Sequence, residues 1–144
     1  MSAIFTAQTG NAFTITQSSA LPASRPDYLG GAAVMPDYRT TLRYLNPANF
    51  ARVPIIAASG ATARPGNVGN GEIRGPGLWN IDFSLAKNFK LTERAQLQIR
   101  TDMFDALNHT NYSGLITEIT NPRFGLLTST LGARTIQLNA RLSW

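Results

Sequence analysis

Apolar and polar residues alternate along the last stretch of the chain, residues 133–144. The apolar parity consists of Ile136, Leu138, Ala140, Leu142 and Trp144. Side chains of a β-strand point to opposite faces in turn, so the pattern predicts a one-sided strand of about ten residues. This length and the aromatic end suit a strand that crosses a membrane between lipid and a polar lumen. A strand of a soluble β-sandwich shows the same alternation.

Two further stretches, residues 78–91 and 95–107, repeat this alternation and are joined by the short polar segment 92–94. Their apolar positions are Trp79, Ile81, Phe83 and Leu85 in the first arm and Ala95, Leu97, Ile99, Thr101 and Met103 in the second. The pattern predicts an antiparallel hairpin. Lys87 interrupts the apolar parity near the end of its arm, where a lysine can extend its ammonium group out of the hydrocarbon.

A less regular strand is predicted for residues 3–17, where Gly10-Asn11 marks a kink or, in an alternative interpretation, the turn of a short hairpin. No period survives in residues 18–77, which hold seven prolines, and residues 109–132 are irregular too. We expect long loops in both segments. Long connections at one end of a strand set and a short one at the other are typical of outer-membrane barrels. The sequence therefore predicts an all-β fold: antiparallel up-and-down strands of a transmembrane β-barrel, about four in number, with long loops.

Composition agrees with alternating strands. Of the 144 residues, 43% are hydrophobic and 15% are charged, and no apolar run approaches the roughly 18 residues of a membrane helix. The chain has no cysteine, which excludes a disulfide scaffold and a thiolate metal site. The net charge is +5, but Lys and Arg are scattered singly, so we expect no nucleic-acid partner. The first residues lack the basic and apolar regions of a secretory signal peptide.

No set of residues forms a catalytic motif. His109 is the single histidine, and we expect it to have a structural role at a loop edge. Asp102 and Asp105 are three residues apart, so in a strand they would point to opposite faces, and Asp102 is expected to pair with Arg100 or Arg141. The glycines near residue 70 do not have the spacing of a dinucleotide-binding loop. We therefore expect no catalytic residue, no cofactor, no metal and no enzymatic activity.

Several blocks of sequence point to a known family when they are taken together. They are residues 74–94, 97–100, 104–111, 121–125 and 133–138 with the rest of the terminal strand. These blocks resemble the C-terminal end of TonB-dependent outer-membrane receptors, and most closely the Oar-like group. Residues 5–13 resemble an earlier strand-and-loop segment of that family. The resemblance spans nearly the whole chain and is most specific in its second half.

The resemblance implies a barrel of about 22 strands with a plugged lumen, located in the cell outer membrane of Gram-negative type. Four strands cannot close a barrel, and an open edge in lipid leaves backbone groups unsatisfied. We therefore interpret residues 1–144 as a single segment, the C-terminal part of a receptor barrel. Its expected partners are outer-membrane lipid, the remaining receptor strands or copies of itself, and the barrel-assembly machinery, which is thought to read the terminal aromatic residue, here Trp144.

The candidate functional residues are those expected to face the membrane or to take part in assembly. They are Trp79, Ile81, Phe83, Leu97, Ile99, Ile136, Leu138, Leu142 and Trp144. The first functional hypothesis is the outer-membrane barrel portion of a TonB-dependent receptor for nutrient transport, a fragment not transport-competent alone. The alternative is a self-assembling structural β-protein that forms a larger sheet, fibre or oligomer through open strand edges. A soluble β-sandwich binding module is a third hypothesis.

Overall fold

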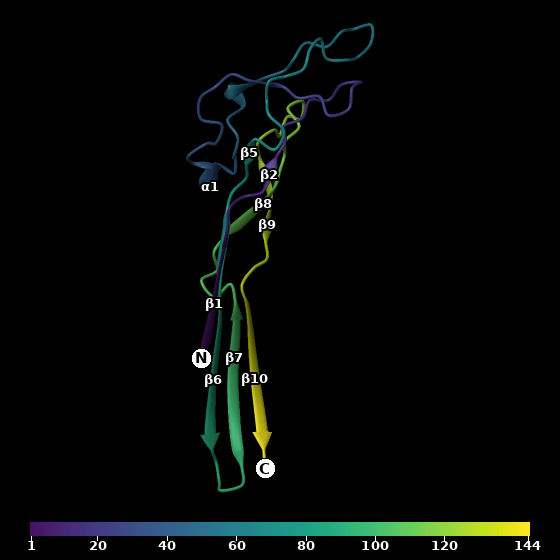
Figure 1. Cartoon of the computed structure of the whole chain (residues 1–144). Helices are drawn as coiled ribbons and strands as arrows, with labels where there is room; N and C mark the ends of the chain where they lie inside the picture. The colour runs from purple at the N-terminus through teal and green to yellow at the C-terminus, as the bar shows by residue number, and fades with distance from the viewer. The chain divides into compact units, whose positions relative to one another are not determined.

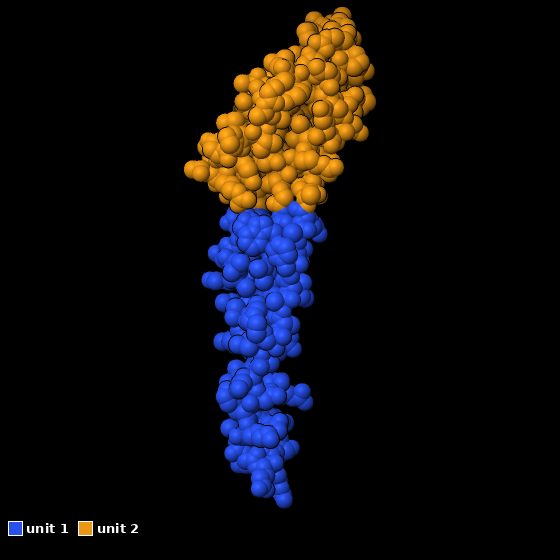
Figure 2. Space-filling model, turned by 60° about the vertical axis from the view of Figure 1, so that its left-hand side comes forward, with its two compact units in different colours: residues 1–8, 78–111, 131–144 blue, residues 9–77, 112–130 orange.

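A computed structural model describes all residues from Met1 to Trp144. The chain divides into two compact units, which Figure 2 distinguishes by colour. We call the first the sheet unit; it contains Met1–Gln8, Leu78–Asn111 and Leu131–Trp144. We call the second the loop unit; it contains Thr9–Gly77 and Tyr112–Thr130. No helix in the structure has the length and apolar character needed to cross a membrane.

The sheet unit is an open four-stranded antiparallel sheet (Figure 1). Its strands are β1 (Ser2–Gln8), β6 (Leu78–Lys90), β7 (Gln96–Phe104) and β10 (Thr135–Ser143), paired in the order β1-β6-β7-β10. The predicted all-β fold of antiparallel up-and-down strands is confirmed. The barrel is not closed, because β1 and β10 each have one unpaired edge.

A turn of polar residues joins β6 to β7, as the sequence predicts. The backbone N–H groups of Leu91 and Thr92 both donate to the carbonyl of Ala95, at 2.9 and 3.2 Å. The hydroxyl of Thr92 accepts from the N–H groups of Arg94 and Ala95, at 3.3 and 3.0 Å. A threonine hydroxyl thus satisfies backbone donors that a two-stranded ladder would leave free in the turn.

The first strand is shorter than the predicted 3–17. Strand β1 ends at Gln8, and after a break β2 (Ala12–Phe13) pairs with β5 (Ile73–Arg74). At the break a Cβ on Gly10 would lie 1.8 Å from the carbonyl oxygen of Gly75, so glycine is required there. The alternative hairpin is not formed, because the two strands pair with β6 and β5 rather than with each other.

Regular structure is sparse in the loop unit, where prolines interrupt every segment. Its remaining elements are β3 (Asp27–Tyr28), α1 (Tyr38–Thr41), η1 (Pro47–Asn49), β4 (Phe50–Ala51), β8 (Asn111–Leu115) and β9 (Leu127–Leu131), of which β8 begins and β9 ends in residues of the sheet unit. Strand β3 pairs with β4, and β8 pairs with β9.

The loop unit nevertheless encloses a hydrophobic core, which the absence of a period in residues 18–77 did not indicate. The buried cluster contains Ile15, Tyr44, Leu45, Phe50, Val68, Ile73, Ile119, Phe124 and Leu127. Its members come from segments far apart in the sequence, so no local periodicity marks them. Ile15 and Leu45 are fully buried at its centre. Residues 14–17 therefore leave the strand predicted for them because their apolar member enters this core.

Two polar side chains hold distant segments of the loop unit together. The buried amide of Gln17 donates to the carbonyl of Val53 at 2.7 Å and accepts from its N–H at 2.8 Å. The carboxylate of Glu118 accepts from the Thr16 hydroxyl, the Ser18 N–H, and the N–H and hydroxyl of Thr120. Burial raises the pKa of Glu118, but these hydrogen bonds outweigh it, and the net pKa is lowered.

Because the pKa of Glu118 is lower in the folded chain, its contribution to stability is present above the ordinary pKa of 4.5 and is lost as pH falls through the folded value. We expect Glu118→Gln to destabilise the loop unit by on the order of 1 kcal/mol at pH 7, and by less at pH 4. All four tyrosines lie in the loop unit, so near-ultraviolet circular dichroism in the tyrosine band during urea unfolding measures the effect.

The matched control is Glu93→Gln, which neutralises an exposed carboxylate in the hairpin turn of the sheet unit. We expect no change in the tyrosine transition of this variant at either pH. Equal shifts in the two variants would contradict the structural role of Glu118.

Candidate lipid-facing surface

The strand register brings the apolar parities of all four strands to one face of the sheet. Directly opposite residues of an antiparallel pair share a face, and Phe83 stands opposite Met103, which stands opposite Ile136. We call this face the apolar face. Its residues are Ala3, Phe5, Ala7, Trp79, Ile81, Phe83, Leu85, Lys87, Phe89, Leu97, Ile99, Thr101, Met103, Ile136, Leu138, Ala140 and Leu142. Trp144 continues the same parity just beyond β10.

Large apolar side chains on this face are exposed. Leu138 is 75% exposed, Ile136 and Leu142 are each 51% exposed, and Trp144 is 90% exposed. Exposed apolar surface of this extent marks a site of contact with lipid or with another protein. Every one of the candidate membrane-facing residues of the sequence lies on this parity.

Aromatic side chains stand near both ends of the apolar face. At one end the ring of Trp79 lies 6.4 Å from that of Phe5 and 4.0 Å from that of His109, measured between centroids. Phe89 lies near the other end of the same strand. From Trp79 to Phe89 the strand advances roughly 34 Å, at about 3.4 Å per residue. A tilt of about 40° reduces this to roughly 26 Å, close to the apolar band of outer-membrane barrels, which aromatic girdles flank.

The opposite face of the sheet is mostly polar, with Ile4 and Phe104 as exposed large apolar exceptions, and carries its own hydrogen bonds. Asp102 accepts from the Ser84 hydroxyl at 2.6 Å and forms an ion pair with Nε of Arg100 at 2.9 Å. The amide of Gln98 donates to that of Asn88 at 2.9 Å. The predicted pairing of Asp102 with Arg100 is therefore present. Asp105 does not join it, because β7 ends at Phe104.

The segment from Phe104 to Asn111 folds back along β6 in a turn. Its backbone is left-handed at two positions, with φ of 50° at Asp105 and 51° at Asn108, residue types that tolerate this conformation. The N–H of Asp105 donates to the Asp82 carboxylate at 3.0 Å, and that of Ala106 donates to the Ile81 carbonyl at 2.8 Å. The turn thus continues to supply hydrogen bonds to β6 after β7 has ended.

Asn111 completes this arrangement with its side chain. The residue is 6% exposed; its amide oxygen accepts from the N–H of Trp79 and its amide nitrogen donates to the Trp79 carbonyl, both at 2.9 Å. The Nδ1 atom of His109 lies 3.1 Å from the same amide oxygen. The structure thus places His109 beside Asn111 and Trp79 at the edge of the turn. The sequence did not single out Asn111 as a structural residue. It is the last residue of the block 104–111, in which the alternation of β7 fades.

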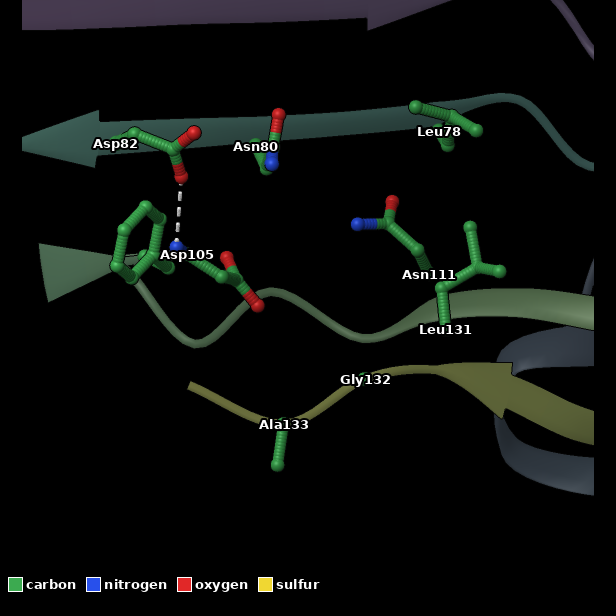
Figure 3. Close-up of a pocket in the computed structure, with 9 residues that line it drawn as sticks. Leu78, Asn80, Asp82, Asp105, Asn111, Leu131, Gly132 and Ala133 are labelled. Carbon is green, nitrogen blue, oxygen red and sulfur yellow. Dashed lines mark hydrogen bonds between the residues drawn. The ribbon is translucent and has the colours of Figure 1, made fainter. Parts of the chain in front are cut away.

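A cavity of about 230 Å³ opens beside this turn on the polar face (Figure 3). It is lined by Leu78, Asn80, Asp82, Phe104, Asp105, Asn111, Leu131, Gly132 and Ala133. Figure 3 shows Asp82 of β6 facing the backbone of Asp105 across it. Asp82, Asp105 and Asn111 all hold neighbouring backbone groups, and no group of three or more His, Cys, Asp or Glu side chains in the chain could hold a metal ion. These polar groups serve the turn.

Comparison with known proteins gives one match. A family model described as an outer membrane beta barrel domain matches residues 1–137. This range includes β1, β6 and β7 entire and the first residues of β10. No curated protein and no solved structure matches the chain.

The role of Asn111 gives a testable prediction. We expect Asn111→Ala to destabilise the sheet unit by about 1–3 kcal/mol, because it leaves both backbone groups of Trp79 without a partner. Both tryptophans lie in the sheet unit, so urea unfolding followed by the fluorescence of Trp79, in a Trp144→Phe background and in detergent, measures the change.

The matched control is Asn80→Ala, in the same cavity lining, because the side-chain oxygen of Asn80 is buried without a hydrogen-bond partner. Its removal should cost less than 1 kcal/mol. A loss at Asn80 as large as that at Asn111 would contradict the bridging role of Asn111.

Proposed function

Since the chain belongs to the outer membrane beta barrel domain family, we propose that it forms part of the barrel wall of a TonB-dependent receptor of the Oar-like group. The chain is an outer-membrane β-barrel protein. The receptor assignment is supported by the sequence blocks that resemble this group, above all residues 74–94 and 104–111. In this proposal the barrel takes part in nutrient transport, and these strands have no catalytic role.

The observation that carries the proposal is the apolar face, on which Lys87 and Thr101 are the two polar residues. Four strands from separate parts of the chain contribute to it in register, while the other face carries the Ser84, Arg100 and Asp102 network. A soluble domain would need to cover the exposed leucines of β10, whereas a membrane strand places them in lipid. We propose that the apolar face meets lipid and the polar face lines the lumen.

The two open edges of the sheet define the proposed partners. Lipid cannot bond the unpaired N–H and C=O groups of β1 and β10, and each such group costs several kcal/mol in hydrocarbon. In the proposed receptor these edges pair with further barrel strands. Trp144, which follows β10, is the residue that the barrel-assembly machinery would recognise, as the family resemblance implies.

The connections of the sheet suit a receptor. The connection from β1 to β6 starts and ends where Gln8 stands opposite Leu78, and that from β7 to β10 starts and ends where Phe104 stands opposite Thr135. Both of these contribute residues to the loop unit, whereas the hairpin at the opposite end of β6 is short. We propose that the long connections lie outside the cell and contribute to ligand capture.

The open edges also favour a second candidate function. Copies of the chain could pair β10 of one with β1 of the next and build a larger sheet, fibre or ring. Fractionation of expressing cells with and without detergent, followed by negative-stain imaging, separates the two candidates. Recovery from the outer membrane or from detergent alone supports the barrel, whereas regular fibres or rings in detergent-free buffer would contradict the receptor proposal.

Two neighbouring substitutions in β10 test the orientation of the sheet. Leu138→Arg places a charge on the apolar face and should weaken folding into phospholipid vesicles by about 2–4 kcal/mol. Gln137→Arg places the same charge on the polar face, opposite Asp102, and should be tolerated. Vesicle flotation and urea titration of the inserted protein measure both. Equal losses in the two variants would exclude a lipid-facing apolar face.

A further inference from the structure

The loop unit contains a cavity that combines two arginines with aromatic walls. Its volume is about 250 Å³, and Arg43, Arg52, Asn121, Phe50 and Phe124 are among the residues that line it. None of the lining residues is acidic. Binding sites for small molecules characteristically place a few polar groups on mostly apolar walls.

Both guanidinium groups are positioned without being neutralised. Nη1 of Arg43 donates to the carbonyl of Phe124 at 3.2 Å, and Nη2 of Arg52 donates to the carbonyl of Ile119 at 3.4 Å. Neither arginine forms a salt bridge, unlike Arg64, which pairs with Asp27, and Arg100, which pairs with Asp102. A guanidinium carries five N–H donors, so each of the cavity arginines keeps donors for a ligand.

The nearest carboxylate along the chain lies outside the cavity lining. Glu118 precedes Ile119, but its oxygens accept hydrogen bonds from three other residues and it does not line the cavity. Asn121 accepts from the N–H of Arg123 at 2.8 Å through its side-chain oxygen, which leaves its amide nitrogen as a further donor. The polar part of the cavity therefore offers donors on cationic and neutral groups.

The apolar walls complement these donors. The rings of Phe50 and Phe124 pack edge to face with their centroids 5.6 Å apart, and the two residues are 6% and 4% exposed. Pro47 and Pro122 add rigid apolar surface. A ring or short aliphatic body of a ligand would contact the exposed Pro47 and Pro122 and the accessible edges of the two phenylalanines behind them, while its charged group reaches the arginines.

We propose that this cavity binds small organic anions in which a carboxylate is attached to an apolar ring. Guanidinium groups match carboxylate geometry with paired N–H donors, and the aromatic and proline walls select the attached ring over a fully hydrated ion. The inference rests on the proposed function for its biological role, because a receptor loop unit would use such a cavity to capture its nutrient. The binding itself depends only on the loop unit.

The test uses the full chain in detergent micelles, with benzoate as the probe and binding followed by nuclear magnetic resonance titration. We expect saturable benzoate binding, at least about tenfold weaker binding of neutral benzyl alcohol, and about tenfold weaker benzoate binding in both Arg43→Gln and Arg52→Gln. The control Arg74→Gln removes an exposed arginine of the same unit outside the cavity and should leave binding unchanged. The tyrosine circular dichroism of each variant verifies that the loop unit is folded.

Equal benzoate affinity in the wild-type chain and both cavity variants would overturn the assignment, as would equal affinity for benzyl alcohol. Inorganic phosphate that binds as tightly as benzoate would contradict the role of the aromatic walls. A chain that inserts into membranes and shows no benzoate binding refutes this inference alone. A chain that assembles into detergent-free fibres refutes the receptor proposal and leaves the binding measurement valid.

Discussion

The structure depends throughout on the need of buried backbone groups for hydrogen-bond partners. Where two strands lie side by side the ladder meets this need, and where a strand ends a side-chain amide replaces it. Asn111 bonds both backbone groups of Trp79, and Gln17 does the same for Val53 in the loop unit. In both cases the amide supplies one donor and one acceptor, as a neighbouring strand residue would. By the same constraint, the outer edges of β1 and β10 still need hydrogen-bond partners, because no strand of this chain pairs with them.

Local patterns were sufficient to predict the long strands and the faces of the sheet. The alternation in residues 78–107 fixes which side chains share a face within each arm, and the short polar turn fixes how the arms pair. The register that places Phe83 opposite Met103, and Met103 opposite Ile136, then extends one face across three strands. The candidate surface follows from this face because strand geometry leaves a side chain only two directions.

The loop unit could not be predicted in the same way. Ile15, Leu45 and Ile119 meet in one core although about thirty to seventy residues of chain separate each from the next. Their packing depends on the conformation of the intervening prolines and turns, which leaves no repeating signal in the sequence. The positions of the cavity arginines could not be predicted for the same reason, because Arg43 and Arg52 bond the distant carbonyl groups of Phe124 and Ile119. The role of Asn111 could not be predicted because it depends on where β7 ends. Only after β7 ends at Phe104 is the backbone of Trp79 left for the Asn111 side chain to bond.

Lys87 has a further consequence for the position of the sheet in a bilayer. It lies on the apolar face between Leu85 and Phe89, opposite Ile99. If this face meets lipid as proposed, the ammonium group must reach the headgroups at that end, while Trp79 occupies the interface at the other. Sliding the sheet by one pair of residues in one direction would draw Lys87 into the hydrocarbon. Sliding it in the other direction would draw Trp79 from the interface into the hydrocarbon. In the proposed orientation the two side chains would therefore set the immersion depth of the protein, independently of the partner strands that close its edges.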